Sequence, residues 1–292
     1  MRWIAAAAGC ALTMGLLAPS GGQAQPDEIA RRAPPFTWLD EVLPEASADL
    51  RIPDWASPLE RAEIEVGAGR YRRALYSLGD GFTEDETRAA IVRVRALSAL
   101  GRTDEALELA GSKEWNSPTL LCEHARVLAR VGRVDDAIKL LQDQIAIWAG
   151  SAEVRYELGR LLELRGRYEE ARATYAWFIE GPTNHLDAWR QRGERDYESA
   201  ERLVAIARGI DRWATLGMKY PELPGLNDTV LAMLTAAYDV VDRGYWPARV
   251  AVAEYFLAHN NSEEAVKELS AAATINPHDE RTLELLGRVA LE

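Results

Sequence analysis

The 292-residue sequence predicts an all-α protein built as a solenoid of helix–turn–helix repeats. Three observations support this fold class: the phrase Gly-Arg-x-x-x-Ala occurs four times, its alanines are spaced by 32, 31 and 34 residues, and apolar residues at helical spacing follow each copy. A repeat of this length accommodates one pair of helices, and each pair buries its apolar face against its neighbours. Chain length therefore counts repeats here, and not globular domains.

The first element, residues 1–24, has the pattern of a secretory signal peptide. It combines a basic start at Arg2, an apolar run over residues 4–18 and small residues up to Ala24. The run is shorter than the ~20 residues of a membrane-spanning helix, so we expect no transmembrane segment in the mature chain. A buried N-terminal helix and a lipoprotein anchored through Cys10 are the alternatives. The sequence thus predicts export, to the periplasm or out of the cell.

Residues 25–54 are predicted to form a Pro-rich extended arm or linker. Five prolines fall in this stretch, and no 3.6-residue apolar period is sustained through it. Prolines at this density prevent a long helix. The arm is either anchored by Trp38 and Trp55 or a plain disordered tether.

Residues 55–186 contain the four copies of the phrase. They lie at Gly69–Ala74, Gly101–Ala106, Gly132–Ala137 and Gly166–Ala171. In each copy the glycine is expected to end the first helix in a left-handed conformation, and the alanine lets the two helices approach closely. Acidic pairs in the last three copies suit the start of the second helix, where the helix dipole favours negative charge.

Local patterns predict where several of these helices begin. Ser57-Pro-Leu-Glu60 and Thr83-Glu-Asp-Glu86 both read as capping boxes. Ser117-Pro118 places a proline at the first helical position, where its missing N–H costs nothing.

Residues 187–243 depart from the repeat pattern. They carry two helical stretches, 195–218 and 228–243, which a turn rich in Pro and Gly (220–225) joins. We expect a divergent long helical pair without the signature residues.

Residues 244–292 are predicted to hold one more repeat and a last helix. The repeat is marked by Asn260-Asn-Ser-Glu-Glu-Ala265, a degenerate copy of the phrase. Residues 280–292 match the first helix of a further unit. They are either a terminal capping helix or the end of a chain truncated before an absent downstream domain.

The repeats resemble the tetratricopeptide repeat (TPR) family. Leu158-Gly159 and Leu286-Gly287 stand where that family has its Leu-Gly pair, and Pro277 stands where it has its helix-ending proline. The resemblance implies a right-handed superhelical solenoid. It also implies that the first helices of successive units line a concave groove, which binds an extended peptide or a helix of another protein.

Five residues are candidates for partner binding by this resemblance. Alignment on the alanines puts Arg95, Arg126 and Arg160 at the ninth position of three consecutive units, Arg130 at the thirteenth and Tyr156 at the fifth. Guanidinium groups hold carboxylates bidentately, which suits an acidic segment or a free C-terminus. The alternative is a solvated or internally salt-bridged face, which would be indicated if the guanidinium groups point outward or pair with acids of neighbouring helices.

Composition and motifs exclude several other classes. The net charge of −12 is opposite to the basic footprint of a nucleic-acid-binding protein. Two cysteines, Cys10 and Cys122, cannot build a disulfide framework or a Cys-based zinc site. The sequence has no His-Glu-x-x-His, no Gly-x-Ser-x-Gly and no phosphate-binding Gly loop. We therefore expect no catalytic residues, no metal and no cofactor.

Three functional hypotheses follow. The first is a non-enzymatic interaction scaffold in the cell envelope that binds its partner in the groove. The second is the N-terminal repeat region of a larger exported enzyme, since residues 227–232 and 244–249 faintly resemble the repeats that precede a metallopeptidase-like domain. The third is an envelope assembly factor. The partner's identity, the pathway and the oligomeric state are left open.

Overall fold

The structure is a computed structural model, and it describes residues 52–79, 85–112, 117–192, 197, 199–219 and 222–291. The predicted signal peptide (1–24) and residues 25–51 of the predicted arm lie outside the described residues. All the described helices belong to the second of two units, residues 42–292. None of them is long and apolar enough to span a membrane.

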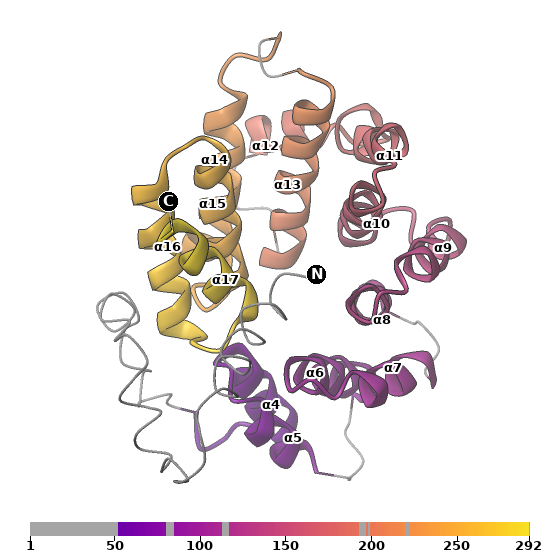
Figure 1. Cartoon of the computed structure of the whole chain (residues 1–292), viewed down its shortest axis with the longest axis vertical. Helices are drawn as coiled ribbons and strands as arrows, with labels where there is room; N and C mark the ends of the chain where they lie inside the picture. The colour runs from indigo at the N-terminus through magenta and orange to yellow at the C-terminus, as the bar shows by residue number, and fades with distance from the viewer. Residues whose placement is uncertain are drawn as a thin grey trace, which may run out of the picture. The chain divides into compact units, whose positions relative to one another are not determined.

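The first half of the described chain consists of four helix pairs in chain order (Figure 1). They are α4 (Pro58–Gly67) with α5 (Tyr71–Leu78), α6 (Glu86–Ala99) with α7 (Thr103–Ser112), α8 (Pro118–Arg130) with α9 (Val134–Gln144), and α10 (Ala152–Leu164) with α11 (Tyr168–Glu180). Within each pair the two helices pack on each other, and the first helices α4, α6, α8 and α10 also contact one another in sequence. The predicted all-α repeat solenoid is confirmed.

Glycine closes the turn inside each of these pairs. The four glycines of the repeated phrase have φ between +71° and +84°, the left-handed region that other residues rarely adopt. In the second pair the N–H of Arg102 donates to the carbonyl of Leu97 (2.9 Å), which ties the end of α6 into the turn. Asn260 takes the same conformation (φ +56°) in the degenerate copy, as asparagine can.

Capping side chains set where the helices begin. At Ser57 the predicted capping box is present, since its Oγ accepts from the N–H of Glu60 (3.2 Å) and its own N–H donates to Glu60 Oε2 (2.8 Å). The predicted start at Thr83 is wrong. Helix α6 begins at Glu86, and Asp85 caps it by accepting from the N–H of Arg88 (2.9 Å). An aspartate is a strong N-cap residue, and here it lies directly before the helix.

The described residues of the divergent region form three α-helices and a π turn. These are α12 (His185–Arg192), α13 (Ala200–Leu216), α14 (Leu226–Ala236) and η3 (Ala237–Val241), where η3 is a single π-helical turn that continues α14. Helix α13 starts later than the predicted residue 195, because Ser199 Oγ accepts from the N–H of Arg202 (3.2 Å) and caps it there. Helix α13 packs on α10, α11, α14 and α15.

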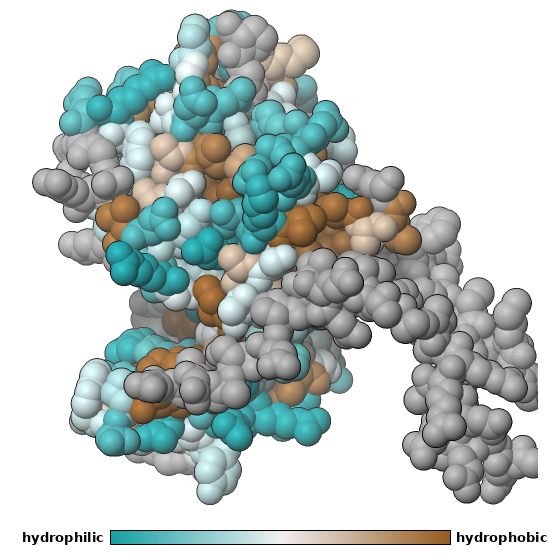
Figure 2. Space-filling model, turned by 90° about the vertical axis from the view of Figure 1, so that its left-hand side faces the viewer, coloured by the Kyte–Doolittle hydropathy of each residue, from teal (hydrophilic) through white to brown (hydrophobic). Residues whose placement is uncertain are grey.

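The last described helices are α15 (Trp246–Ala258), α16 (Ser262–Ile275) and α17 (Glu280–Val289). Helices α15 and α16 form a pair, and α17 packs on α16. Leu285 and Leu286 are buried in this packing, whereas Leu291 is 90% exposed. Hydrophilic side chains and smaller apolar patches alternate on the visible described surface in Figure 2.

Glycines allow close packing at two places where helices meet. A Cβ atom at Gly159 would lie 2.4 Å from the ring of Tyr175, and one at Gly209 would lie 2.3 Å from the ring of Phe178. Both aromatic rings are fully buried. Helices α10, α11 and α13 therefore pack closely because no side chain separates them at these two points.

The turn between α16 and α17 contacts the first repeat. Asn276, between α16 and α17, is 1% exposed, and its Nδ2 donates to the hydroxyl of Tyr71 at the start of α5 (3.0 Å). Arg130 at the end of α8 pairs with Glu280 of α17 (3.6 Å). We call these two interactions, which join segments far apart in the sequence, the end contact.

Candidate functional site

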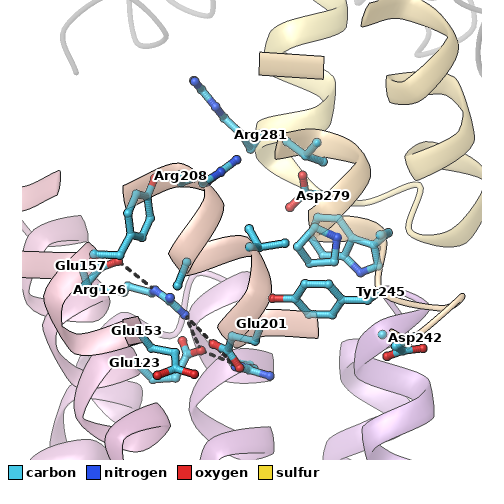
Figure 3. Close-up of a pocket in the computed structure, with 18 of the residues that line it drawn as sticks. Glu123, Arg126, Glu153, Glu157, Glu201, Arg208, Asp242, Tyr245, Asp279 and Arg281 are labelled. Carbon is cyan, nitrogen blue, oxygen red and sulfur yellow. Dashed lines mark hydrogen bonds and ion pairs between the residues drawn. The ribbon is translucent and has the colours of Figure 1, made fainter. Parts of the chain in front are cut away.

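The first helices of the repeats face a groove of about 900 Å³. Helices α4, α6, α8 and α10 supply one part of its lining, and α13, α15, the start of α17 and the segment between η3 and α15 supply the rest. Figure 3 shows charged side chains from these different helices pointing into this space. The groove is therefore formed by the repeats together with the divergent region.

Four of the five predicted binding residues line this groove: Arg95, Arg126, Tyr156 and Arg160. They come from the same face of α6, α8 and α10, and their spacing by one repeat brings them together. Arg130 is not part of the lining. Its Nη1 donates to the carbonyl of Ser98 (3.0 Å), and its Nη2 forms the ion pair with Glu280.

We call Arg95, Arg126 and Arg160 the arginine ladder. Each of these three arginines is paired with carboxylates of the chain itself. Arg95 donates to Glu123 of the next helix (2.6 Å). Arg126 contacts Glu123 of its own helix (2.9 Å) and Glu157 of the next (3.3 Å), as Figure 3 shows. Arg160 binds Glu157, three residues earlier in α10 (2.5 Å).

The pairing of Arg95 and Arg126 with neighbouring helices is the pattern that favours an internally salt-bridged face. Glu201, in the first turn of α13, extends this network across the groove to Arg95 (3.5 Å) and Arg126 (3.8 Å). A carboxylate of a partner would therefore compete with carboxylates that the arginines already hold. The predicted acidic partner stays a prediction, and this charge pairing argues against it.

Burial and ion pairing in this network shift the pKa values of its carboxylates and guanidinium groups. Burial alone would raise the pKa of Glu157, but Arg160 and Arg126 outweigh it and hold the pKa at about 2. Burial likewise opposes ionisation of Arg126, and the carboxylates of Glu123 and Glu157 more than compensate, so its pKa lies well above the ordinary value. Glu157 and Arg126 thus stay charged around neutral pH.

Hydrogen-bond capacity remains on the ladder. One guanidinium nitrogen of each arginine has no acceptor among the described residues: Nη1 of Arg95, Nη2 of Arg126 and Nη1 of Arg160. A guanidinium has five N–H donors in a fixed plane, and the carboxylates fix the orientation of these planes. The groove thus presents a row of oriented donors.

The other side of the groove combines aromatic and apolar side chains with a second ionic cluster. Glu254 of α15 binds both Arg208 of α13 and Arg281 of α17 (2.6 Å to Arg281). Tyr245 and Trp246, at the start of α15, line the groove beside them. The ring of Tyr245 points across the groove toward Glu201 (Figure 3).

The sequence did not predict most of the charged and aromatic residues that line the groove with the ladder. Glu123 and Glu157 could have been found, because each lies three residues before a ladder arginine on the same helix. Glu201 and Tyr245 carry no such signal. They reach the groove only because α13 and α15 pack there, outside the repeat pattern.

Metal ligands are not grouped in the part of the chain that the structure describes. No three or more His, Cys, Asp or Glu residues in it are placed to hold a metal ion. Cys122 is buried, and burial raises the pKa of its thiol well above the ordinary value. That thiol is therefore a packing group and not a nucleophile.

The fold and groove define a helical repeat protein in which consecutive helix pairs present their first helices to a common concave side. Residues 128–176, which span the end of α8 through most of α11, match the family model of the tetratricopeptide repeat. This segment is thus similar to the tetratricopeptide repeat, a fold that suggests a protein–protein interaction scaffold. A comparison with curated protein sequences gave no match.

Several solved structures are similar to this chain. TTC0263 from Thermus thermophilus, a thermophilic TPR protein, is 22% identical over 69% of this chain and 96% of its own, with a TM-score of 0.43. YrrB, described as a TPR protein with an unusual peptide-binding site, is 17% identical over 75% of this chain and 99% of its own (TM-score 0.30). BtubC from P. vanneervenii is 18% identical over 74% and 90% (TM-score 0.31).

Proposed function

We propose that this protein is a non-enzymatic scaffold whose groove binds a peptide or helix of a partner protein. The observation that carries the proposal is the row of oriented guanidinium donors on Arg95, Arg126 and Arg160. Donors at a spacing of one repeat, held in place by internal carboxylates, suit the carbonyl groups of an extended main chain. Tyr156 lies beside Arg160 on the same helix and offers a packing surface.

The apolar and aromatic side of the groove supports the same proposal. Val204 and Val250 are buried at its wall, and Tyr245 and Trp246 lie at its surface. Aromatic side chains contribute large contact areas with little loss of conformational entropy, so they are frequent anchors in protein interfaces. A bound peptide therefore gains main-chain hydrogen bonds on one side and side-chain packing on the other.

A steric variant tests whether peptides bind in the groove. Gly67 ends α4, lines the groove and has open space where a Cβ would be. We expect Gly67→Trp to weaken binding of peptides, selected from a random 12-residue library on the wild-type protein, by tenfold or more in fluorescence anisotropy. Gly287→Trp is the matched control, because Gly287 is also helical with open space but lies outside the groove.

Two outcomes would contradict the proposal. One is equal binding by the wild type and Gly67→Trp. The other is the absence of any enriched peptide on a protein whose circular dichroism shows the folded state.

The sequence pattern of residues 1–24 supports the cell envelope as the setting of this function. Mass spectrometry of the N-terminus in fractionated cells tests this part separately. We expect a mature chain that begins at Gln25 in the exported fraction, and an intact Met1 in the cytoplasmic fraction alone would contradict it.

A further inference from the structure

The lining of the groove has an excess of negative charge. Eight carboxylates and five guanidinium groups face it. Arg95, Arg126 and Arg160 are balanced by three carboxylates of their own network, as described above. Glu63 pairs with Arg88 of α6 (2.6 Å). After these ion pairs are counted, some carboxylates of the lining have no basic side chain paired with them.

Three carboxylates of the lining make no ion pair with a described residue. Glu153, in the first turn of α10, accepts a hydrogen bond from Ser151 Oγ (2.7 Å). Asp242, after the π turn, accepts from the N–H of Gly244 (2.9 Å). Asp279 caps α17 and binds the N–H and hydroxyl of Thr282, both through one oxygen (2.7 Å). Each is held in place by neutral donors, which do not neutralise its charge.

These carboxylates are distributed along the groove and not clustered. Glu153 comes from the repeat side, whereas Asp242 and Asp279 come from the opposite side, around Tyr245 (Figure 3). Burial raises the pKa of Asp279 and outweighs the hydrogen bonds from Thr282 and the more distant charge of Arg130. The aromatic faces of Tyr245 and Trp246 beside Asp242 add a favourable environment for a cation.

We propose that the groove selects a basic peptide segment, whose Lys or Arg side chains pair with Glu153, Asp242 and Asp279. This inference rests on the proposed function, since it names the chemistry of the partner in the same groove. An acidic segment would meet a net negative lining and would compete with Glu123, Glu157 and Glu201 for the arginines of the ladder. A basic segment meets unpaired carboxylates and leaves the ladder intact.

The test uses random 12-residue peptides selected on the full chain. We expect the enriched peptides to carry a positive mean net charge relative to the input library. We also expect the best of them to bind about tenfold more weakly to a triple variant, Glu153→Gln with Asp242→Asn and Asp279→Asn. Asparagine is as good an N-cap residue as aspartate, so the substitution at Asp279 keeps the cap of α17 and the fold.

A second triple variant controls for the change in overall charge. Glu108→Gln, Glu169→Gln and Glu180→Gln alter three carboxylates on the second helices α7 and α11, away from the groove. This variant is expected to bind the same peptides within twofold of the wild type. An equal loss in both triple variants would assign the preference to the protein's total charge and overturn the inference.

Other outcomes separate this inference from the proposed function. Enrichment of neutral or acidic peptides whose binding Gly67→Trp abolishes would overturn the basic selectivity and leave groove binding in place. Absence of any enriched peptide would contradict the proposed function itself.

Discussion

His185 illustrates how a single buried residue can make stability depend on pH. Its ring packs against Trp177 (centroids 5.0 Å apart) and Phe178 (6.1 Å), and its Nε2 is buried without a hydrogen-bond partner among the described residues. Burial, with a smaller contribution from Arg202, lowers the pKa of His185 to about 4. The folded protein therefore keeps this ring neutral over most of the acidic range.

We predict that acidification destabilises the protein through His185. The unfolded ring has a pKa near 6.5, so between pH 6.5 and pH 4 the unfolded state binds a proton that the folded state does not. The stability that the neutral His185 ring gives the folded state is fully present above pH 6.5. As the pH falls to 4, up to about 3 kcal/mol of the free energy of unfolding is lost. Urea unfolding across this range is expected to show a smaller loss for His185→Gln than for the wild type. The less buried residue His278, changed to Gln, is the control, and identical pH profiles for all three proteins would refute the prediction.

The arginine ladder shows which residues of the groove could be predicted from the sequence. The repeat spacing placed Arg95, Arg126 and Arg160 on one face, and the structure puts all three in the groove. Whether they bind a partner stays a prediction. Their partners across the groove could not be foreseen, because Glu201 is 106 residues from Arg95 and belongs to a helix without the repeat signature.

At the scale of elements, the Leu-Gly pair has two different packing roles. Gly159 of α10 lies against the ring of Tyr175 in α11, and any Cβ there would overlap it. Gly287 of α17 has the same sequence signature, but nothing lies within 4 Å of its Cβ position. The same motif is thus required by packing in one repeat and not in the other.

We predict opposite effects of alanine at these two glycines. Gly159→Ala is expected to lower the free energy of unfolding by about 2 kcal/mol, because the added methyl group forces α10 and α11 apart. Gly287→Ala is expected to raise it by about 0.5 kcal/mol, since alanine favours the helix. Chemical denaturation of both variants checks this, and equal shifts of the same sign would show that packing does not distinguish the two sites.

Most helices follow from local signals, and the differences have local causes. The Gly turns predicted the end of each first helix, and serine or proline predicted the starts at Ser57 and Pro118. The separate helix α12 and the π turn at Ala237–Val241 were not predicted. A π turn is rare, and it carries no sequence signature of the kind that marks the Gly turns and the caps.

At the scale of the whole described unit, the end contact departs from the nearest-neighbour packing of a simple repeat stack. The Asn276–Tyr71 hydrogen bond joins residues that are 205 positions apart. A Cβ at Gly69 would lie 2.2 Å from Asn276 Oδ1, so the Gly turn of the first repeat leaves room for this side chain. This glycine therefore serves both its own turn and the packing of the last one.

We predict that the hydroxyl of Tyr71 couples the two ends of the unit. Tyr71→Phe leaves the buried amide of Asn276 without its acceptor and is expected to cost about 1–2 kcal/mol. Hydrogen exchange is expected to become faster in both α4–α5 and α16–α17. Tyr76→Phe, on the same helix but 89% exposed, is the control. Faster exchange at one end alone would show that the ends are not coupled.

The end contact also bears on the thermodynamics of recognition. An open stack of repeats can change its length and curvature. A ligand that fixes one of these conformations binds more weakly, because conformational entropy is lost on binding. Here the hydrogen bond between Tyr71 and Asn276 and the pair between Arg130 and Glu280 restrain that motion before any partner arrives. If the groove binds a peptide as proposed, the entropy of ordering it has already been lost during folding, and the peptide would meet a preorganised surface.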